Sequence, residues 1–148
     1  MLRRWLLPDV SGGPAAVGLL VLRVIAGLGL MLHGWPKIQN AFGWMGPASH
    51  IPGPLQALAA LSEFGGGLAL VLGLLTPLAA LGVAVTMLVA IFMVHIAKGD
   101  PFVRSGPPPG GSYELAAIYF GAALLLLLGG PGRFSLDYLL FGRGGRRL

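Results

Sequence analysis

The sequence AAVGLLVLRVIAGLGLMLHGWPK, residues 15–37, is an apolar run that is interrupted halfway by Arg23. About 20 apolar residues suffice to cross about 30 Å of hydrocarbon as a helix. We therefore predict a membrane span over about residues 14–35, with Pro14 at the first helical position, where its missing amide hydrogen costs nothing. Three further apolar runs follow, and each carries one ionisable residue: Glu63, His95 and Glu114.

The composition indicates an integral membrane protein. Of the 148 residues, 55% are hydrophobic and 10% are charged, against about 25% charged residues in soluble domains. The sequence predicts an all-α fold: one polytopic membrane domain over residues 1–148, a bundle of four transmembrane helices followed by a short C-terminal interfacial helix. The predicted spans are about 14–35, 54–75, 77–98 and 112–128.

Charge distribution predicts the topology. The net charge is +5, but the basic residues stand at the ends of the apolar runs and form no stripe suited to nucleic acid. Six arginines flank the four spans near the two termini, so both termini are expected in the cytoplasm and the protein in the inner (plasma) membrane. No apolar stretch long enough for a signal peptide precedes the first span, which is expected to remain as an anchor.

Two opposite charges are expected near mid-membrane. Arg23 lies about nine residues into the first span, and Glu63 lies about nine into the second, which enters from the other side. An isolated charge there costs at least about 2.5–3.5 kcal/mol, so we predict an intramembrane Arg23–Glu63 ion pair. Such a pair would either lock the bundle or take part in proton relay or substrate binding.

A cup of polar residues is expected at the outer membrane boundary. His33 and Lys37 are four residues apart and His95 and Lys98 are three apart, so each pair shares a helix face. Such donors suit an anionic headgroup or quinone carbonyls, although interfacial residues that only satisfy their neighbours would give the same pattern. The predicted cup holds His33, His95 and Glu114 as proton-exchanging groups and Lys37, Lys98 and Tyr113 as ligand contacts.

A metal site is not predicted. Histidine and carboxylate are ordinary metal ligands, but no HxxxH or ExxH spacing is present, and the chain has no cysteine. Phosphate loops, nucleotide fingerprints and serine-nucleophile motifs are also missing.

Small residues lie near the charged residues of the first two spans. Gly27 and Gly34 share the helix face of Arg23, and Gly67 is near Glu63, so these glycines would allow close helix packing.

Several short motifs follow one another in a specific order. They are LRVIAG at 22–27 with HGWPK at 33–37; Glu63 with GG at 66–67 and GLLT at 73–76; HIAKG at 95–99; YEL at 113–115; and GPGRFSLD at 130–137. As an ordered set they resemble the DoxX family of small bacterial and archaeal membrane proteins. Pro36 and the proline tract before Ser112 depart from that pattern.

The resemblance implies a four-helix membrane protein related to the membrane subunit of a thiosulfate:quinone oxidoreductase. We therefore expect a membrane subunit of an oxidoreductase-type complex that contacts lipid, binds a quinone headgroup or docks a redox partner at its outer face, and receives electrons from outside the chain. A non-catalytic assembly protein, which would pack its small-residue faces on other spans or on further copies as a homo-oligomer, and a small transporter are the alternatives.

Overall fold

The structure, a computed structural model, describes residues 13–107 and 109–142, and these residues form helices and loops without strands. Three helical stretches are long and apolar enough to cross a membrane, and they are candidates for three of the four predicted spans. The helices are α2 (Gly13–Ile38), α3 (Gly53–Leu72), α4 (Thr76–Val89), the π-helix η1 (Ala90–His95), the 3₁₀ turn η2 (Ile96–Lys98), α5 (Glu114–Gly129) and the π-helix η3 (Tyr138–Gly142).

The helices differ from the predicted spans in three ways. Pro36 lies inside α2, which continues to Ile38, so this proline does not end the helix. The third span is continuous from Thr76 to Lys98 but changes from α to π winding at Ala90. The fourth apolar helix, α5, has 16 residues and would measure about 24 Å, short of the hydrocarbon thickness. A fourth span therefore stays a prediction.

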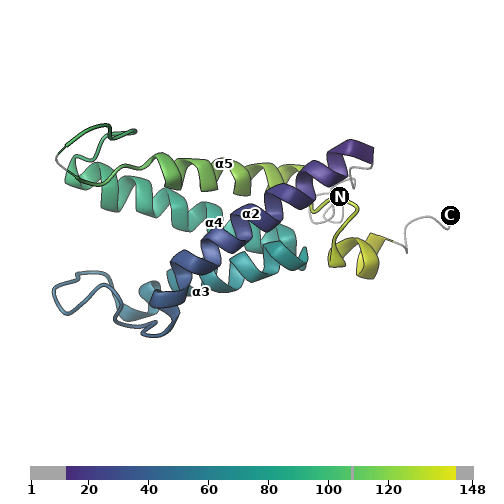
Figure 1. Ribbon diagram of the computed structural model, residues 1–148. Coiled ribbons are helices and arrows are strands. Elements are labelled where there is room, and N and C mark those ends of the chain that lie inside the picture. Colours follow the sequence, from purple (N-terminus) through teal and green to yellow (C-terminus); the bar gives the residue numbers. More distant parts are fainter. Residues whose placement is uncertain (1–12, 108, 143–148) are drawn as a thin grey trace.

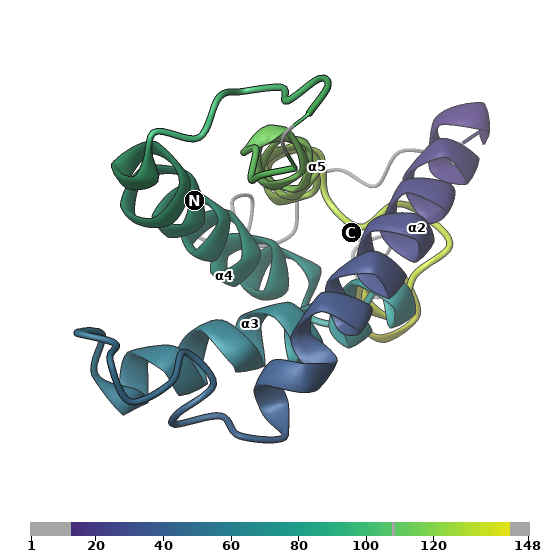
Figure 2. The same ribbon diagram turned by 60° about the vertical axis from the view of Figure 1, so that its left-hand side comes forward.

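Each of the four long helical segments packs against the next one in the sequence, and the bundle does not close between the first and the last. Helix α2 packs along α3, α3 along α4, and α4 along α5, whereas α2 and α5 contact each other little (Figures 1 and 2). One end of the bundle carries the connections 39–52 and 99–113, and we name it the long-loop end. The opposite end carries the α3–α4 turn and the segment 130–142, and we name it the short-turn end (Figure 1).

Glycine allows the backbones of α2 and α3 to approach closely. A Cβ atom added at Gly27 would lie 2.6 Å from the carbonyl oxygen of Gly67, and one added at Gly34 would lie 2.9 Å from the Cα of Phe64. Association in lipid depends on such packing rather than on the hydrophobic effect. The predicted role of Gly27, Gly34 and Gly67 as close-contact residues is thus confirmed.

The α3–α4 turn is tight and unusual in its backbone. Helix α3 ends at Gly73, which has φ +65°, and the amide of Leu74 donates to the carbonyl of Ala69. Leu75 also has a positive φ of 49°, which is strained for a residue with a side chain. Helix α4 then begins with Pro77 in its first turn, so the two helices are adjacent and antiparallel.

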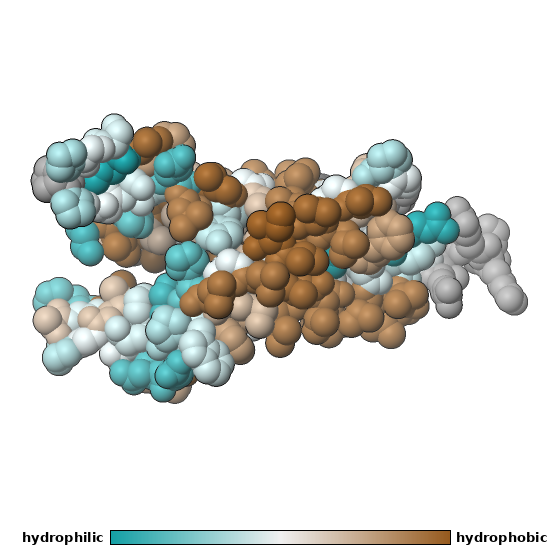
Figure 3. Space-filling model, viewed as in Figure 1, coloured by the Kyte–Doolittle hydropathy of each residue, from teal (hydrophilic) through white to brown (hydrophobic). Residues whose placement is uncertain are grey.

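The surface divides into an apolar band and a polar end. Large apolar side chains are exposed along the helices, and Figure 3 shows them as a continuous brown area beside the more polar long-loop end. Such an area is far larger than soluble monomers expose, and it fits contact with lipid. The long-loop end is hollowed between the two loops.

Candidate functional site

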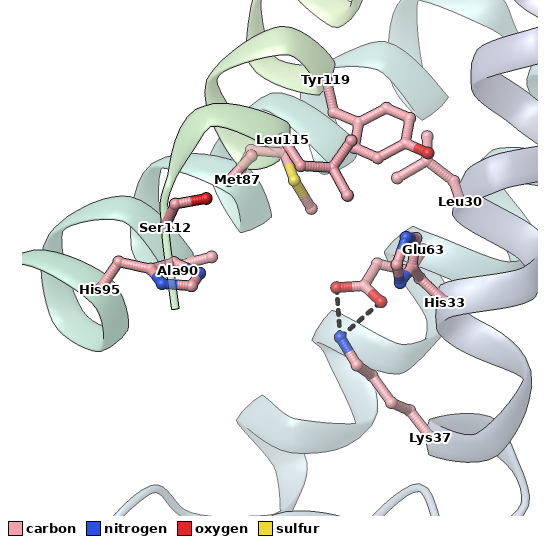
Figure 4. A pocket seen from close by; sticks show the side chains of 11 residues that line it. Leu30, His33, Lys37, Glu63, Met87, Ala90, His95, Ser112, Leu115 and Tyr119 are labelled. Atoms are coloured by element: carbon pink, nitrogen blue, oxygen red, sulfur yellow. Dashed lines mark hydrogen bonds and ion pairs between the residues drawn. The ribbon is translucent and has the colours of Figure 1, made fainter. Parts of the chain in front are cut away.

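A pocket of about 250 Å³ lies between the helices toward the long-loop end (Figure 4). Helix α2, the third span and α5 each supply three lining residues, while α3 and the loop before α5 supply one each. Its polar lining residues are His33, Lys37, Glu63, His95, Ser112 and Tyr119. Its apolar lining residues are Leu30, Met87, Ala90, Leu115 and Ala116.

The strongest interaction in the pocket is an ion pair between Lys37 and Glu63. The Lys37 ammonium donates to both carboxylate oxygens at 2.6 Å, as the dashed lines in Figure 4 show. The Glu63 side chain is 6% exposed and that of Lys37 is 24% exposed, so the pair borders open space on the lysine side. The same ammonium lies 4.6 Å from the ring centre of Trp44, where a cation–π interaction adds to its stabilisation.

The predicted Arg23–Glu63 ion pair is wrong. Arg23 is fully buried at the short-turn end and donates to the carbonyl oxygens of Leu70 and Phe134. Leu70 stands seven residues beyond Glu63 on α3, which corresponds to about 10 Å along the helix axis. Glu63 is paired with Lys37 instead, and the Arg23 guanidinium is held by backbone carbonyls.

The short-turn end is closed by the segment that follows α5. The Asp137 carboxylate accepts hydrogen bonds from the backbone amides of Leu75 and Thr76 at 2.7 and 2.8 Å. These amides begin α4, where the helix dipole favours a negative charge. The Asp137 amide in turn donates to the carbonyl of Gly73 at 2.8 Å. The structure thus makes the C-terminal motif a cap for the α3–α4 turn.

The predicted interfacial helix after Ser135 is present as a short helical turn. The Ser135 hydroxyl accepts from the amide of Tyr138, as expected for a capping residue, and η3 follows. Leu139, Leu140 and Phe141 on this turn are exposed. The three terminal arginines lie outside the described residues.

Tyr119 extends from α5 to α2 beside His33. The two rings meet edge to face, with centroids 6.1 Å apart. A Cβ atom added at Gly29 would collide with the Tyr119 hydroxyl, so the glycine provides the space that this hydroxyl occupies. Figure 4 shows the Tyr119 ring directed toward α2. Sequence reasoning missed Tyr119, although a tyrosine in the middle of an apolar run was a usable signal.

His95 lines the pocket and is held by a loop residue. Its Nδ1 lies 2.8 Å from a carboxylate oxygen of Asp100, and the Asp100 amide donates to the His95 carbonyl at 2.9 Å. Arg104 lies 3.9 Å from the second oxygen of the same carboxylate. His95 also ends the π-helix η1, and such widened turns are frequent at functional sites. Asp100 was not predicted as part of the site.

The remaining predicted cup residues do not line the pocket. Glu114 is half-buried in the first turn of α5, Lys98 is exposed, and Tyr113 packs on Phe102 with ring centroids 5.3 Å apart. The cup is therefore smaller than predicted. His50 is exposed in the first long loop.

Gln56 fastens the first long loop to α3 and was also missed. It is 4% exposed, its side-chain amide donates to the carbonyl of Ile51 at 2.8 Å, and its side-chain oxygen accepts from the amide of Met45 at 3.0 Å. The indole of Trp44 donates to the backbone carbonyl of Gln56 at 3.0 Å. This arrangement holds Trp44 beside Lys37.

Comparison with known proteins identifies the family of the chain. Residues 18–96 match the DoxX family model. The chain belongs to the DoxX family. It is 35% identical over 128 residues to "Inner membrane protein YqjF" of Escherichia coli (strain K12), a match that covers 84% of this chain and 92% of the relative. An "Uncharacterized protein" of Haemophilus influenzae is 31% identical over 125 residues, covering 83% and 90%. No solved structure matches the chain.

The pocket of this DoxX protein offers hydrogen-bond donors and proton carriers rather than a metal centre. Within residues 13–107 and 109–142, no three histidine, aspartate or glutamate side chains converge on a point where a metal ion could bind. The ammonium of Lys37, the hydroxyl of Tyr119 and the imidazole of His33 instead surround a space bounded elsewhere by apolar carbon. Such a site can orient a small polar group and exchange protons with it.

Proposed function

We propose that this DoxX-family membrane protein is a subunit of an oxidoreductase-type complex and binds the headgroup of a quinone in the pocket at its long-loop end. The observation that carries the proposal is the gathering of Lys37, Glu63, His33, His95 and Tyr119 around one space between largely apolar helices. Polar groups in a membrane span are costly and usually mark a functional site.

The chemistry of the lining suits a quinone ring. A quinone presents two carbonyl oxygens at opposite edges of a flat apolar ring, so it needs donors at the edges and carbon above and below. Lys37 and Tyr119 supply donors, while Leu30, Met87 and Leu115 supply apolar contacts. The volume of about 250 Å³ is below the roughly 300–1,000 Å³ of pockets that enclose whole drug-sized ligands, so a single ring fits while a tail stays outside.

The titratable residues would move protons, and electrons would come from elsewhere. Reduction of a quinone to a quinol takes up two electrons and two protons. The imidazoles of His33 and His95 line the pocket as candidate proton-transfer groups, and Glu63 is held in the same pocket by Lys37. The chain has no cysteine, so the electrons would be delivered by a partner subunit or a soluble donor at the long loops.

The proposal includes the topology. With α5 as a short fourth span and the arginine-rich termini in the cytoplasm, the pocket opens toward the outside of an inner membrane. Local thinning of the bilayer around α5 would accommodate its 16 residues at a modest cost. A transport path is less well supported than a binding site, because buried Arg23, Ser135 and Asp137 fill the short-turn end.

Thermal unfolding with and without a quinone tests the proposal. Purified protein in lipid nanodiscs would be heated with decyl-benzoquinone, and saturation at 100 times Kd should stabilise it by about 2.7 kcal/mol. A His33→Ala/His95→Ala variant should lose most of this stabilisation. A His50→Ala variant is the matched control, because His50 lies in the exposed loop outside the pocket.

Equal stabilisation of the wild type and the His33→Ala/His95→Ala variant would contradict binding in this pocket. Absence of any stabilisation, in the wild type as well, would contradict the quinone proposal itself.

A further inference from the structure

The pocket has an opening on the side of the bundle, between α2 and α5. Both helices line it, through His33 on α2 and Leu115 on α5, yet they contact each other little. Figure 1 shows the two helices diverging toward the long-loop end. Leu115 is 46% exposed and His33 is also exposed, although both border the pocket. A residue that lines a pocket and reaches the surface marks a place where the pocket meets that surface.

The surface around this opening is apolar. Leu32, which precedes His33, is 76% exposed, and Ile118, which precedes Tyr119, is 58% exposed. Both belong to the lipid-facing band of the molecule. The opening therefore connects a polar pocket with the hydrocarbon of the bilayer, where an uncovered polar group is costly.

Tyr119 closes the opening toward the short-turn end. Its hydroxyl lies against α2 at Gly29, where no side chain intervenes, and Leu30 packs beside it in the pocket lining. The opening thus extends only from this contact to the long-loop end. Its extent on α2 is the two turns from Gly29 to Lys37.

We infer that the ligand is an amphiphile, a quinone with a long apolar tail, which loads sideways from the bilayer between α2 and α5 and leaves its tail in that gap. This inference rests on the proposed function and adds to it the route by which the ligand enters and the place of its apolar tail. The ring occupies the pocket beside Lys37 and Glu63, and the tail covers Leu115 and the neighbouring leucines. When the bound ligand has no tail, lipid chains occupy the gap.

A cross-link across the gap tests the route. The chain has no cysteine, so Leu32→Cys/Ile118→Cys can be bridged specifically with a bis-maleimide in detergent before reconstitution into nanodiscs. The bridge should weaken binding of decyl-benzoquinone at least tenfold and leave the tail-less parent benzoquinone within about twofold. The matched control is Val21→Cys/Leu28→Cys, whose bridge stays within α2 over about 10 Å.

Each outcome has a distinct meaning. Loss of decyl-benzoquinone binding only in the α2–α5 bridged protein supports lateral loading. Unchanged binding of both compounds to that protein overturns lateral loading and leaves the quinone site intact. Failure of both compounds to bind the unbridged protein overturns the proposed function and this inference together.

Discussion

The two ends of the bundle use buried charge in different ways. At the short-turn end, Arg23 and Asp137 are 0% and 3% exposed and bond to backbone carbonyls and amides. At the long-loop end, Lys37 and Glu63 bond to each other beside a pocket of about 250 Å³. The backbone groups that bind Arg23 and Asp137 cannot move away without unfolding a turn. A side chain of the Lys37–Glu63 pair, by contrast, can bind a ligand in place of its partner, because the pair borders open space. This difference fits a stabilising role for the first end and the proposed ligand-binding role for the second.

The largest effect should come from filling the space at Gly73. A Cβ atom there would overlap the Arg23 guanidinium and lie 2.6 Å from the Cβ of Ser135, and the φ of +65° is itself unfavourable for a side chain. Gly73→Leu should therefore cost about 2–5 kcal/mol of stability, the sum of overpacking and backbone strain. Unfolding in mixed micelles with increasing SDS measures this cost.

Gly99→Leu provides the control for backbone strain. Gly99 has a similar φ of +75° but nothing within 4 Å of an added Cβ, so only about 1–2 kcal/mol should be lost. Equal losses at the two glycines would show that the short-turn end is no more tightly packed than a loop.

Removal of the Asp137 carboxylate should give the next largest effect. Asp137→Ala leaves the amides of Leu75 and Thr76 without their charged acceptor and should cost about 2–4 kcal/mol. Asp137→Asn keeps one acceptor oxygen and should restore about half of that loss. Quinone binding per folded molecule should not change in either variant, and a change would couple the two ends.

Double-mutant cycles should sharpen the contrast between ion pairs. Lys37→Met and Glu63→Gln should show a coupling energy of about 0.5–3 kcal/mol, because the two groups touch. Arg23→Met and Glu63→Gln should be additive within about 0.5 kcal/mol, because the structure separates them. Strong coupling in the second cycle would restore the pairing that the sequence suggested.

The smallest effect on stability is expected for Tyr119→Phe. The hydroxyl has no hydrogen-bond partner in the protein among the described residues, so its loss should change the unfolding free energy by less than about 0.5 kcal/mol. Decyl-benzoquinone affinity should fall about five- to tenfold, the value of one hydrogen bond of about 1–1.4 kcal/mol. Leu125→Ala, on the lipid-facing side of the same helix, should leave affinity unchanged.

The sequence predicted the spans well because they depend on composition. Residues 14–35 and 54–75 were predicted, and the helices run over 13–38 and 53–72. The pairing of charges was harder to predict. Counting residues from the expected start of each span does not give the relative height of two helices in contact. The Gly27–Gly67 contact fixes that height and places the Glu63 carboxylate 2.6 Å from the Lys37 ammonium, whereas Arg23 donates to the carbonyl of Leu70.

The site was predicted in part for the same reason. His33, Lys37 and His95 were expected together and do line one pocket, because topology brings their helix ends to one side. Glu114 was assigned from its depth and Lys98 from its three-residue spacing to His95, but neither side chain lines the pocket. Asp100 and Asp137 reach their hydrogen-bond partners because of the conformation of their loops. The spacing of hydrophobic residues in the sequence does not predict that conformation.

The measurement that tests the account most directly compares one variant from each end, Glu63→Gln and Asp137→Asn, by thermal unfolding in nanodiscs with and without decyl-benzoquinone. The account predicts that Glu63→Gln loses most of the ligand-induced rise in Tm, and that Asp137→Asn lowers the ligand-free Tm but keeps the full rise. The reverse pattern, with the ligand effect lost at Asp137 and retained at Glu63, would contradict the division of the molecule into a stabilising end and a binding end.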